Sequence, residues 1–197
     1  MKHIVLASKS PRRKELMGLI TSDFEVRTSD VDERLVEEMF RSEGPKSVAV
    51  NEARFKAEAV WNTLTDSEKE SMIVVAADTS VVLDDIIMGK PKDKEEALHM
   101  LTSLSGRSHS VITGVWVISQ DYNDGFYEES FVHFAPYDEY QKNLIDRYIE
   151  SGDPYDKAGA YGIQNGGALL VSKVDGDYFN VVGLPVMKLA RILSQLG

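Results

Sequence analysis

Cysteine is absent from the 197 residues of this sequence. Without thiols the chain has neither a disulfide framework nor a thiolate metal site, and we expect the reducing cytoplasm as its location. Long apolar runs are absent as well. None approaches the roughly 18 residues of a membrane span, and the first, residues 4–7, is too short for a signal peptide. We therefore expect a cytoplasmic protein without a membrane partner.

Positive charge is scarce, because 22 Lys and Arg residues face 32 Asp and Glu residues and leave a net charge of −10. Proteins that bind long nucleic acids present broad basic surfaces, so we expect no nucleic-acid polymer as a partner. A phosphorylated small molecule needs only a local basic pocket and is not excluded. Linkers and low-complexity tracts are also lacking, and we expect a single domain over residues 1–197, with one core or two closely packed lobes.

A short apolar run, Ile73–Ala77, leads directly into Asp78 and resumes at Val81–Leu83. Such a run, rich in Val, predicts a strand covered on both faces. A carboxylate in such a strand loses hydration and must recover it from a metal, a cation or donated hydrogen bonds. The alternative is that Asp78 lies just beyond a strand end and caps the next turn through Thr79 and Ser80.

The positive residues are not evenly spread, and four of the 22 fall within six positions near the N-terminus: Lys9, Arg12, Arg13 and Lys14. Ser10 followed by Pro11 predicts a helix start. Arg12 and Arg13 then lie in the first turn, where the helix dipole disfavours each cation by a few tenths to ~1 kcal/mol. A bound phosphate would compensate, since a helix N-terminus with two guanidinium groups suits an anion. The alternative is an ordinary solvated face.

Three other polar features have two interpretations each. The acidic stretch Asp30–Glu33 is either a polar loop or a source of the oxygen ligands that Mg²⁺ prefers. Lys56 lies at the edge of the apolar stripe of a predicted helix, where pairing with Glu52 one turn earlier is favoured over reaching across a cleft. Residues 156–167, with four glycines, form either a loop that closes on a ligand or a set of turns. A lone histidine, His109, is interpreted as structural.

Strand and helix signals alternate with at least two hairpin signals, which predicts an α/β fold with a mixed β-sheet. Strands are expected at about 3–7, 24–28, 73–83, 86–88, 110–119 with an interruption at 113–114, 126–134, 168–174 and 178–182. Helices are expected at about 11–19, 45–64, 93–106, 138–151 and 183–196, and a polar connection at 65–71. Residues 123–125 and 175–177 predict tight turns, and Tyr140 is expected to face the core.

Five stretches of the chain carry a resemblance to a known family, in that family's order: Ala7–Leu16, Ala77–Thr79 with Gly89–Pro91, Leu104–Val115, Ser151–Gln164 and Asn180–Pro185. Together they resemble the Maf, or septum-formation-inhibitor, family of nucleoside triphosphate pyrophosphatases. The resemblance implies a two-lobed α/β fold with an elongated mixed β-sheet, flanking helices and a central cleft, similar to inosine-triphosphate pyrophosphatases. It implies one Maf-like pyrophosphatase domain over residues 1–197, and a homodimer.

The resemblance also implies cleavage of a nucleoside triphosphate substrate to the monophosphate and pyrophosphate, with a divalent cation, Mg²⁺ or Mn²⁺, as cofactor. Residues 159–164 are similar to the subgroup that acts on dTTP and UTP. Asp85 departs from the pattern, because the family often has Gly there. The alternatives are the same reaction on modified pyrimidine nucleotides, or a nucleotide-binding regulator of cell division that acts through a protein partner.

Site residues follow from the same resemblance. The matching positions are Asp78 as catalytic proton acceptor, Arg12, Thr79 and Gln164 for substrate choice, Ser8, Arg13, Lys56 and Lys90 for phosphate and substrate binding, and Asp78 with Glu33 for the metal. The chemistry of Gln164 agrees with this subgroup, since one amide can accept from N3–H of uracil or thymine and donate to O4. Both dTTP and UTP are therefore expected as substrates.

Overall fold

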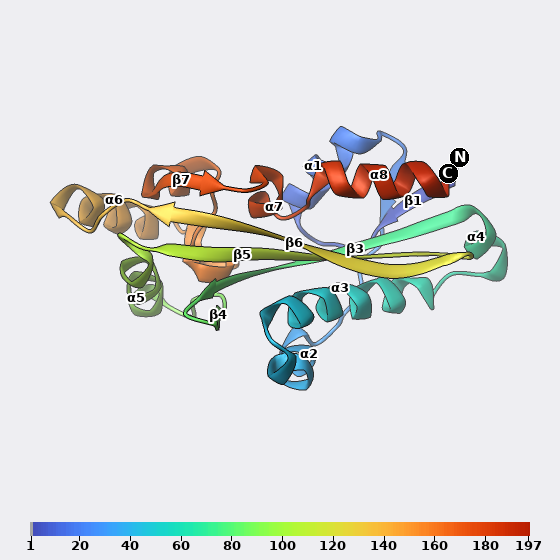
Figure 1. The fold of residues 1–197 in the computed structure, drawn as a ribbon, viewed down its shortest axis with the longest axis horizontal. Helices are drawn as coiled ribbons and strands as arrows, with labels where there is room; N and C mark the ends of the chain where they lie inside the picture. The colour runs from blue at the N-terminus through green and yellow to red at the C-terminus, as the bar shows by residue number, and fades with distance from the viewer. Residues whose placement is uncertain (1) are drawn as a thin grey trace. The chain divides into compact units, whose positions relative to one another are not determined.

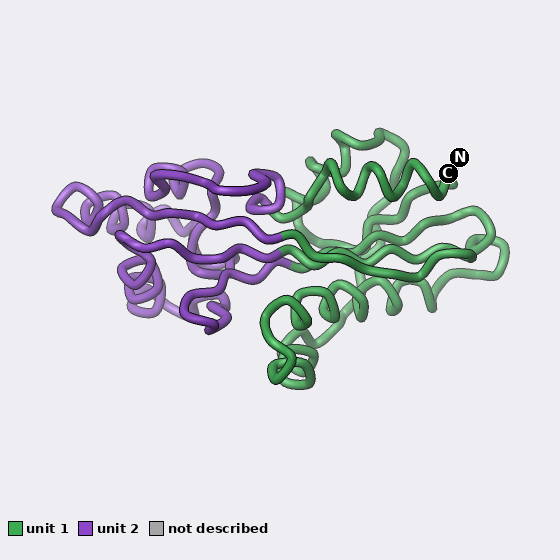
Figure 2. Tube along the Cα trace, in the orientation of Figure 1, with its two compact units in different colours: residues 1–78, 113–128, 183–197 green, residues 79–112, 129–182 purple. Residues whose placement is uncertain are grey.

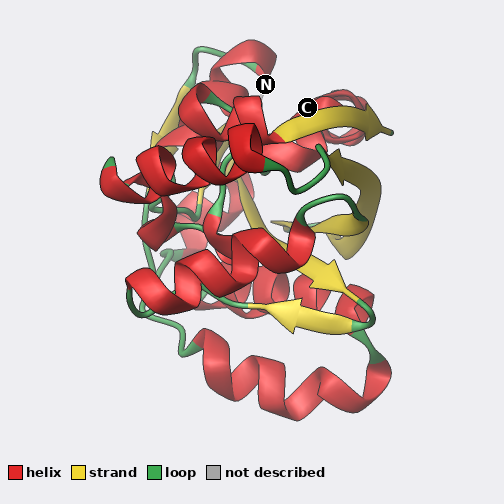
Figure 3. Ribbon diagram, turned by 90° about the vertical axis from the view of Figure 1, so that its left-hand side faces the viewer, coloured by secondary structure: helices red, strands yellow, loops and turns green. Residues whose placement is uncertain are grey.

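The structure is a computed structural model that describes residues 2–197. Over these residues the strands are β1 (His3–Leu6), β2 (Phe24–Val26), β3 (Met72–Leu83), β4 (Ile86–Met88), β5 (Ser108–Ser119), β6 (Tyr122–Phe134) and β7 (Val171–Asp175). The helices are α1 (Pro11–Ile20), α2 (Glu33–Phe40), α3 (Pro45–Trp61), α4 (Asp66–Ser71), α5 (Lys94–Leu104), α6 (Glu139–Glu150), α7 (Tyr178–Val182) and α8 (Val186–Leu196). Short 3₁₀ turns are η1 (Arg41–Glu43), η2 (Asp153–Asp156), η3 (Ala158–Ala160) and η4 (Asn165–Leu170). Figure 3 shows helices and strands in separate colours.

The described strands form one sheet in the order β2-β1-β3-β5-β6-β7, with β4 paired to β3. β1 runs parallel to β2 and β3, and Ile4 lies opposite both Phe24 and Ile73. β4 is antiparallel to β3, and β7 is antiparallel to β6. The prediction of an α/β fold with a mixed sheet is confirmed. No helix among residues 2–197 is long and apolar enough to span a membrane.

The chain folds as two compact units (Figure 2). Unit 1 comprises the residues up to Asp78 together with Thr113–Glu128 and Gly183–Gly197. Unit 2 comprises Thr79–Ile112 and Glu129–Val182. The long strands β3, β5 and β6 each contribute residues to both units, so the chain passes between the units within strands.

In unit 1 the sheet is covered by α3 on one side and by α1 and α8 on the other (Figure 1). The predicted apolar stripe of α3 packs on the sheet, in a buried cluster formed by Val5, Ala7, Ala57, Val60, Leu64, Val74, Ala76 and Ile118. Gly114 explains how close α3 comes, because a Cβ there would lie 2.3 Å from the carbonyl carbon of Ala49. β5 is continuous through this glycine, so the expected interruption at 113–114 is wrong and the close approach is the reason for the glycine.

The core of unit 2 lies between its part of the sheet and the helices α5 and α6, which contact each other. Leu101, Leu104 and Ile145 are fully buried there. The prediction that Tyr140 faces the core is wrong, since it is 68% exposed while the next residue, Gln141, is 2% exposed. The buried side-chain amide of Gln141 is satisfied by a hydrogen bond that it donates to the carbonyl of Leu170 at 3.3 Å.

Three expected elements differ in the structure. Residues 123–125 lie inside β6, and Gly125 serves packing, since a Cβ there would lie 2.2 Å from the Trp116 ring. Residues 178–182 form α7, because Asp177 Oδ1 accepts from Phe179 N at 2.8 Å and starts a helix. The stretch 168–174 is the end of η4 followed by β7.

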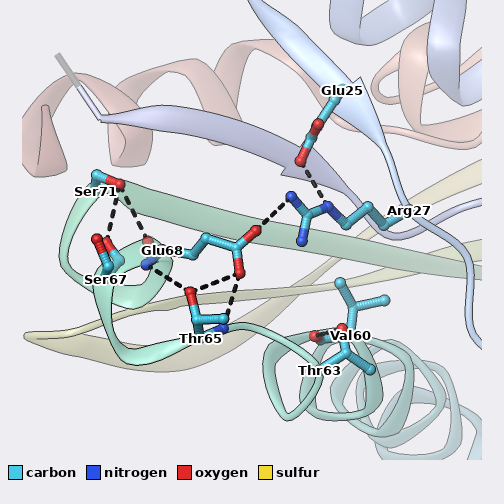
Figure 4. A network of polar contacts seen from close by, with 8 residues as sticks. All are labelled: Glu25, Arg27, Val60, Thr63, Thr65, Ser67, Glu68 and Ser71. Atoms are coloured by element: carbon cyan, nitrogen blue, oxygen red, sulfur yellow. Dashed lines mark hydrogen bonds and ion pairs between the residues drawn. The ribbon is translucent and has the colours of Figure 1, made fainter.

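The expected polar connection at 65–71 is instead α4, which begins with a capping box (Figure 4). Thr65 Oγ1 accepts from Glu68 N at 3.3 Å, and Glu68 Oε2 accepts from Thr65 N at 2.8 Å. Arg27 Nη2 donates to the other carboxylate oxygen of Glu68 at 2.8 Å. The backbone bond from Thr65, followed by those from Arg27 and the Thr65 hydroxyl, lowers the pKa of Glu68 to about 2. Reciprocal capping therefore gives a polar sequence a defined helix.

Candidate active site

Asp78 lies within β3. The residues that flank the pair Asp78–Thr79 in the strand, Ala77 and Ser80, are both buried. The strand continues to Leu83, so the interpretation of Asp78 as a cap beyond a strand end is wrong. Its side chain is only 14% exposed. The sequence argument about a carboxylate in a covered strand therefore applies, and neighbouring side chains must replace its lost hydration.

Lys56 is the direct partner of Asp78. Its Nζ atom lies 2.5 Å from Asp78 Oδ1 and 2.6 Å from Glu33 Oε1, and its side chain is 12% exposed. The prediction that Lys56 simply pairs with Glu52 is wrong. Glu33 is the first residue of α2, a helix that the sequence reasoning missed, and Asp32 caps it by accepting from Arg34 N at 3.1 Å. One ammonium group thus joins α2, α3 and β3.

Glu52 is a further carboxyl group at this site, one helical turn before Lys56. It is 7% exposed, and burial, the charge of Asp78 and a hydrogen bond with Asp78 raise the pKa of Glu52 to about 10. At Asp78 burial opposes ionisation, but Lys56, the hydrogen bond from Glu52 and Arg13 together lower its pKa. At neutral pH the pair is therefore a neutral Glu52 that donates to an ionised Asp78.

Sequence reasoning missed Glu52 as a site residue and treated it only as a candidate ion-pair partner. A usable signal was present: Glu52 borders the buried Ala49 and Ala53 on α3, four residues before a lysine at the same edge. Carboxyl groups are almost never fully buried unless they are paired. The identity of the partner, Asp78, could not be read from local spacing.

The N-terminus of α1 contributes Ser8 and Arg13. Ser10 caps the helix by accepting from Arg13 N at 3.4 Å, and Pro11 is the first helical residue, as predicted. The Arg13 side chain donates to Gly183 O at 2.9 Å and to Ser8 Oγ at 3.5 Å, and Ser8 is 8% exposed. Burial lowers the pKa of Arg13, against the charges of Asp78 and Glu33. Arg12, half-buried in the first turn of α1, adds a second guanidinium beside it.

The predicted metal ligands can be tested against this donor set. Asp78 and Glu33 approach the same ammonium group, so their oxygens converge on one position. Among residues 2–197 no group of three or more His, Cys, Asp or Glu side chains is arranged to hold a metal without help. Mg²⁺ in phosphate-processing sites uses one or two carboxylates together with waters and substrate phosphates. The residues therefore fit a divalent cation that is bound together with a phosphorylated ligand.

The remaining predicted residues, Thr79, Lys90 and Gln164, belong to unit 2. Thr79 follows Asp78 in β3 and is half-buried, whereas Lys90 is exposed just after β4. Gln164 is half-buried and precedes η4, and residues 156–167 contain η3 and the start of η4. Gly159 N donates to Gly89 O at 3.0 Å, which joins the turns before Gln164 to the segment that carries Lys90.

Comparison with known proteins gives a consistent result over the full length. The family model of the Maf-like proteins matches residues 3–196. A protein of Bacillus pumilus is 45% identical over 197 residues, which cover 100% of this chain and 98% of the relative. Proteins of Thermosipho africanus and of a Thermoanaerobacter species are 46% and 47% identical, over 98% of this chain and 93% and 95% of their own lengths. All three relatives bear the name dTTP/UTP pyrophosphatase. The chain belongs to the Maf-like protein family.

Proposed function

We propose that this protein hydrolyses dTTP and UTP to the nucleoside monophosphate and pyrophosphate, and thereby contributes to housekeeping of the nucleotide pool. Family membership over residues 3–196 and the names of relatives at 45–47% identity support this substrate class. The observation that carries the proposal is the pairing of two largely buried groups, Asp78 and Lys56, with Glu33 as a second, more exposed carboxylate. Oxygens of Asp78 and Glu33 both lie within 2.6 Å of Lys56 Nζ. A structural ion pair would not require a third charged partner.

Asp78 would act on the attacking water. Its lowered pKa keeps it ionised at neutral pH, which makes it a weak base but a strong acceptor of a hydrogen bond from water. Glu52 also holds this carboxylate through a hydrogen bond, which restrains its orientation. Orientation of the water in line with the scissile bond is the part of catalysis that this geometry supports best.

Phosphate charge would be met by Arg12, Arg13, Lys56 and Lys90, with Ser8 as a hydroxyl donor. Guanidinium groups suit bidentate binding of phosphate. The ammonium group of Lys56 could exchange a carboxylate partner for a phosphate oxygen, because its side chain is flexible. Asp78 and Glu33 are the residues that would hold Mg²⁺ or Mn²⁺, and such a cation supplies neutralisation of phosphate charge when it is bound. Gln164 would read the N3–H and O4 of uracil or thymine, with Thr79 and Arg12 contributing to substrate choice.

Release of pyrophosphate from a panel of dTTP, UTP, CTP, ATP and GTP, with Mg²⁺ or Mn²⁺, tests this proposal. We expect the monophosphate and pyrophosphate, with dTTP and UTP ahead of the others. Release of orthophosphate in place of pyrophosphate would contradict cleavage at the α-phosphorus. Binding of dTTP without turnover of any nucleotide would favour a nucleotide-binding regulator of cell division. Including methylated pyrimidine triphosphates in the panel resolves the finer substrate choice.

The setting of this activity is also part of the proposal. We place the protein in the cytoplasm as a homodimer that acts on free nucleotides, without nucleic-acid or membrane partners. The lack of cysteine supports the cytoplasm, and the net charge of −10 argues against a nucleic-acid partner. The homodimer rests on the family resemblance alone. Sedimentation velocity tests the dimer directly, and a single species with a mass near 22.0 kDa would contradict it.

A further inference from the structure

The hydroxyl of Tyr148 lies between two partners in unit 2. It donates to Asp153 Oδ2 at 2.6 Å and accepts from Gly162 N at 3.0 Å. Tyr148 itself is 5% exposed and packs in the core of the unit from helix α6. The tyrosine ring is therefore held by the core, while its hydroxyl reaches the turns that precede Gln164.

The direction of both hydrogen bonds is determined by chemistry. A phenol has one proton to donate, and in the structure that proton is directed to Asp153 Oδ2. Burial, and after it the bond to Asp153, raises the pKa of Tyr148, so the phenol keeps its proton. Because the phenol directs its one proton to Asp153, the tyrosine oxygen is left to accept from the Gly162 amide. If the backbone of residues 161–163 moved away, the hydroxyl would lose its hydrogen bond from Gly162 N.

Asp153 is held in turn by Lys157. Lys157 Nζ lies 3.0 Å from Asp153 Oδ1 and donates to Asp156 Oδ1 at 2.7 Å, with a side chain that is 10% exposed. The backbone around this lysine is packed without room for side chains. A Cβ on Gly162 would lie 2.8 Å from Lys157 Cε, and a Cβ on Gly167 would lie 2.0 Å from Gly162 O. Both glycines therefore stand where the segment folds tightly on itself.

Gln164 is only two residues beyond Gly162. The residue between them, Ile163, is 7% exposed, so its buried side chain also anchors the segment. The position of Gln164 is thus set by an apolar anchor at 163 and by a hydrogen bond at 162. The hydrogen bond from Gly159 N to Gly89 O ties the same turns to the segment of Lys90.

We propose that Tyr148 is a positioning residue for substrate selection: its hydroxyl, oriented by Asp153, holds the Gly162 amide and thereby fixes the backbone that presents Gln164 to the base. This inference rests on the proposed hydrolysis of dTTP and UTP. Tyr148 does not touch the substrate in this proposal and acts only through Gln164. Its loss should therefore affect recognition of the base more than the chemical step.

The variant Tyr148→Phe removes only the hydroxyl and keeps the buried ring. We expect KM for dTTP and UTP to rise about fivefold, the factor for one lost hydrogen bond, while kcat stays within about twofold. The preference for dTTP over GTP should fall by a similar factor. Tyr140→Phe, on the same helix but 68% exposed, is the matched control and should leave KM, kcat and preference unchanged.

A double-mutant cycle separates positioning from general stability. In a Gln164→Ala background, Tyr148→Phe should no longer change the preference for dTTP over GTP, because the two residues act in series. An equal loss of preference in both backgrounds would overturn the proposal, as would unchanged KM and preference in Tyr148→Phe itself. Thermal melts of each variant identify losses that arise from unfolding.

Two readouts do not depend on turnover. Amide hydrogen exchange at Gly162 should be at least about fivefold faster in Tyr148→Phe than in wild type, since its acceptor is gone. Binding of the non-hydrolysable analogue α,β-imido-dUTP should weaken about fivefold. Unchanged exchange at Gly162 contradicts the positioning role even if the wild-type protein hydrolyses dTTP. Conversely, a wild-type protein without pyrophosphate release contradicts the proposed function, while the exchange result still decides the role of Tyr148.

Discussion

At the scale of single residues, the site around Asp78 is an arrangement of charge in a poorly hydrated place. Two carboxyl groups that are both buried cannot both be ionised at low cost, and the protein resolves this by protonating Glu52 and ionising Asp78. Lys56 decides which of the two ionises, because its ammonium lies against Asp78. The charge state of each of the three groups therefore depends on the other two.

Replacing Asp78 with Asn tests its role in catalysis. The amide keeps the shape of the side chain but cannot accept a proton or hold water in the same way, so we expect hydrolysis of dTTP to fall roughly 10²- to 10⁴-fold. Binding of α,β-imido-dUTP should change by less than about tenfold, since the phosphate donors remain. Asp121→Asn is a control, because that side chain is 86% exposed. Near-normal turnover in Asp78→Asn would remove this residue from the mechanism.

Replacing Glu52 with Gln tests whether its carboxyl is neutral in the folded protein. The folded pKa of about 10 lies above the ordinary 4.5, so Glu52 contributes stability that is complete below pH 4.5 and is lost as the pH rises toward 10. Gln is neutral in both states and still donates to Asp78. We therefore expect the free energy of unfolding of wild type to decline, relative to Glu52→Gln, between about pH 5 and pH 9.

Urea unfolding at about pH 5, 7 and 9 measures this difference directly. A difference that stays constant across the three values would mean that Glu52 titrates alike in the folded and unfolded chains. Glu52→Ala distinguishes the hydrogen bond from the charge, because it leaves Asp78 without that donor. We expect it to be less active than Glu52→Gln at every pH.

At the scale of elements, periodic apolar patterns identified the long strands and helices. β3 was predicted from Ile73–Ala77 and Val81–Leu83, and α3 from its alanine stripe, because burial on a sheet face imposes such patterns. Short elements were predicted less well. α7 and η4 depend on caps and close packing, and the glycines at 114 and 125 serve tertiary contacts that local spacing does not reveal. Glycine in a strand can indicate a turn or a close neighbour, and the sequence alone does not distinguish them.

Helix α4 is an element whose stability rests on its cap, which yields a test. Its residues are polar and none of them is buried, so packing contributes little. Thr65→Ala removes the side chain that accepts from Glu68 N, and we expect a loss of about 1 kcal/mol in the free energy of unfolding. Ser67→Ala, in the same turn but without a capping role, should stay within about 0.5 kcal/mol of wild type. Equal losses in both variants would contradict the capping argument.

At the scale of the whole molecule, the residues that the resemblance implies for the site are spread along the sequence, from Ser8 to Gln164. The residues that the resemblance implied came from separate motifs, and the grouping of Ser8, Arg13, Glu33, Lys56 and Asp78 in unit 1 could not be derived from spacing. It depends on the parallel pairing of β1 with β3, which places the start of α1 beside the middle of β3. These residues stay together only while the strands are intact, so the site depends on how cooperatively the strands fold.

The strands β3, β5 and β6 each carry residues of both units, so unfolding of one unit alone would break three strands in their middle. We therefore predict that the chain unfolds in a single cooperative transition, as a single domain does. Both tryptophans, Trp61 and Trp116, lie in unit 1, and their fluorescence reports on that unit only. Leu101 is fully buried in unit 2, and Leu101→Ala should cost about 2–5 kcal/mol.

If unfolding is cooperative, Leu101→Ala must lower the urea midpoint of tryptophan fluorescence by as much as it lowers the midpoint seen by far-ultraviolet circular dichroism. Leu98→Ala, on the same helix but 36% exposed, should shift both midpoints much less. A fluorescence midpoint that stays at its wild-type value while circular dichroism shows an earlier phase would mean that the units unfold separately. The chain would then have to be treated as two folding units, and the single domain over residues 1–197 would be wrong.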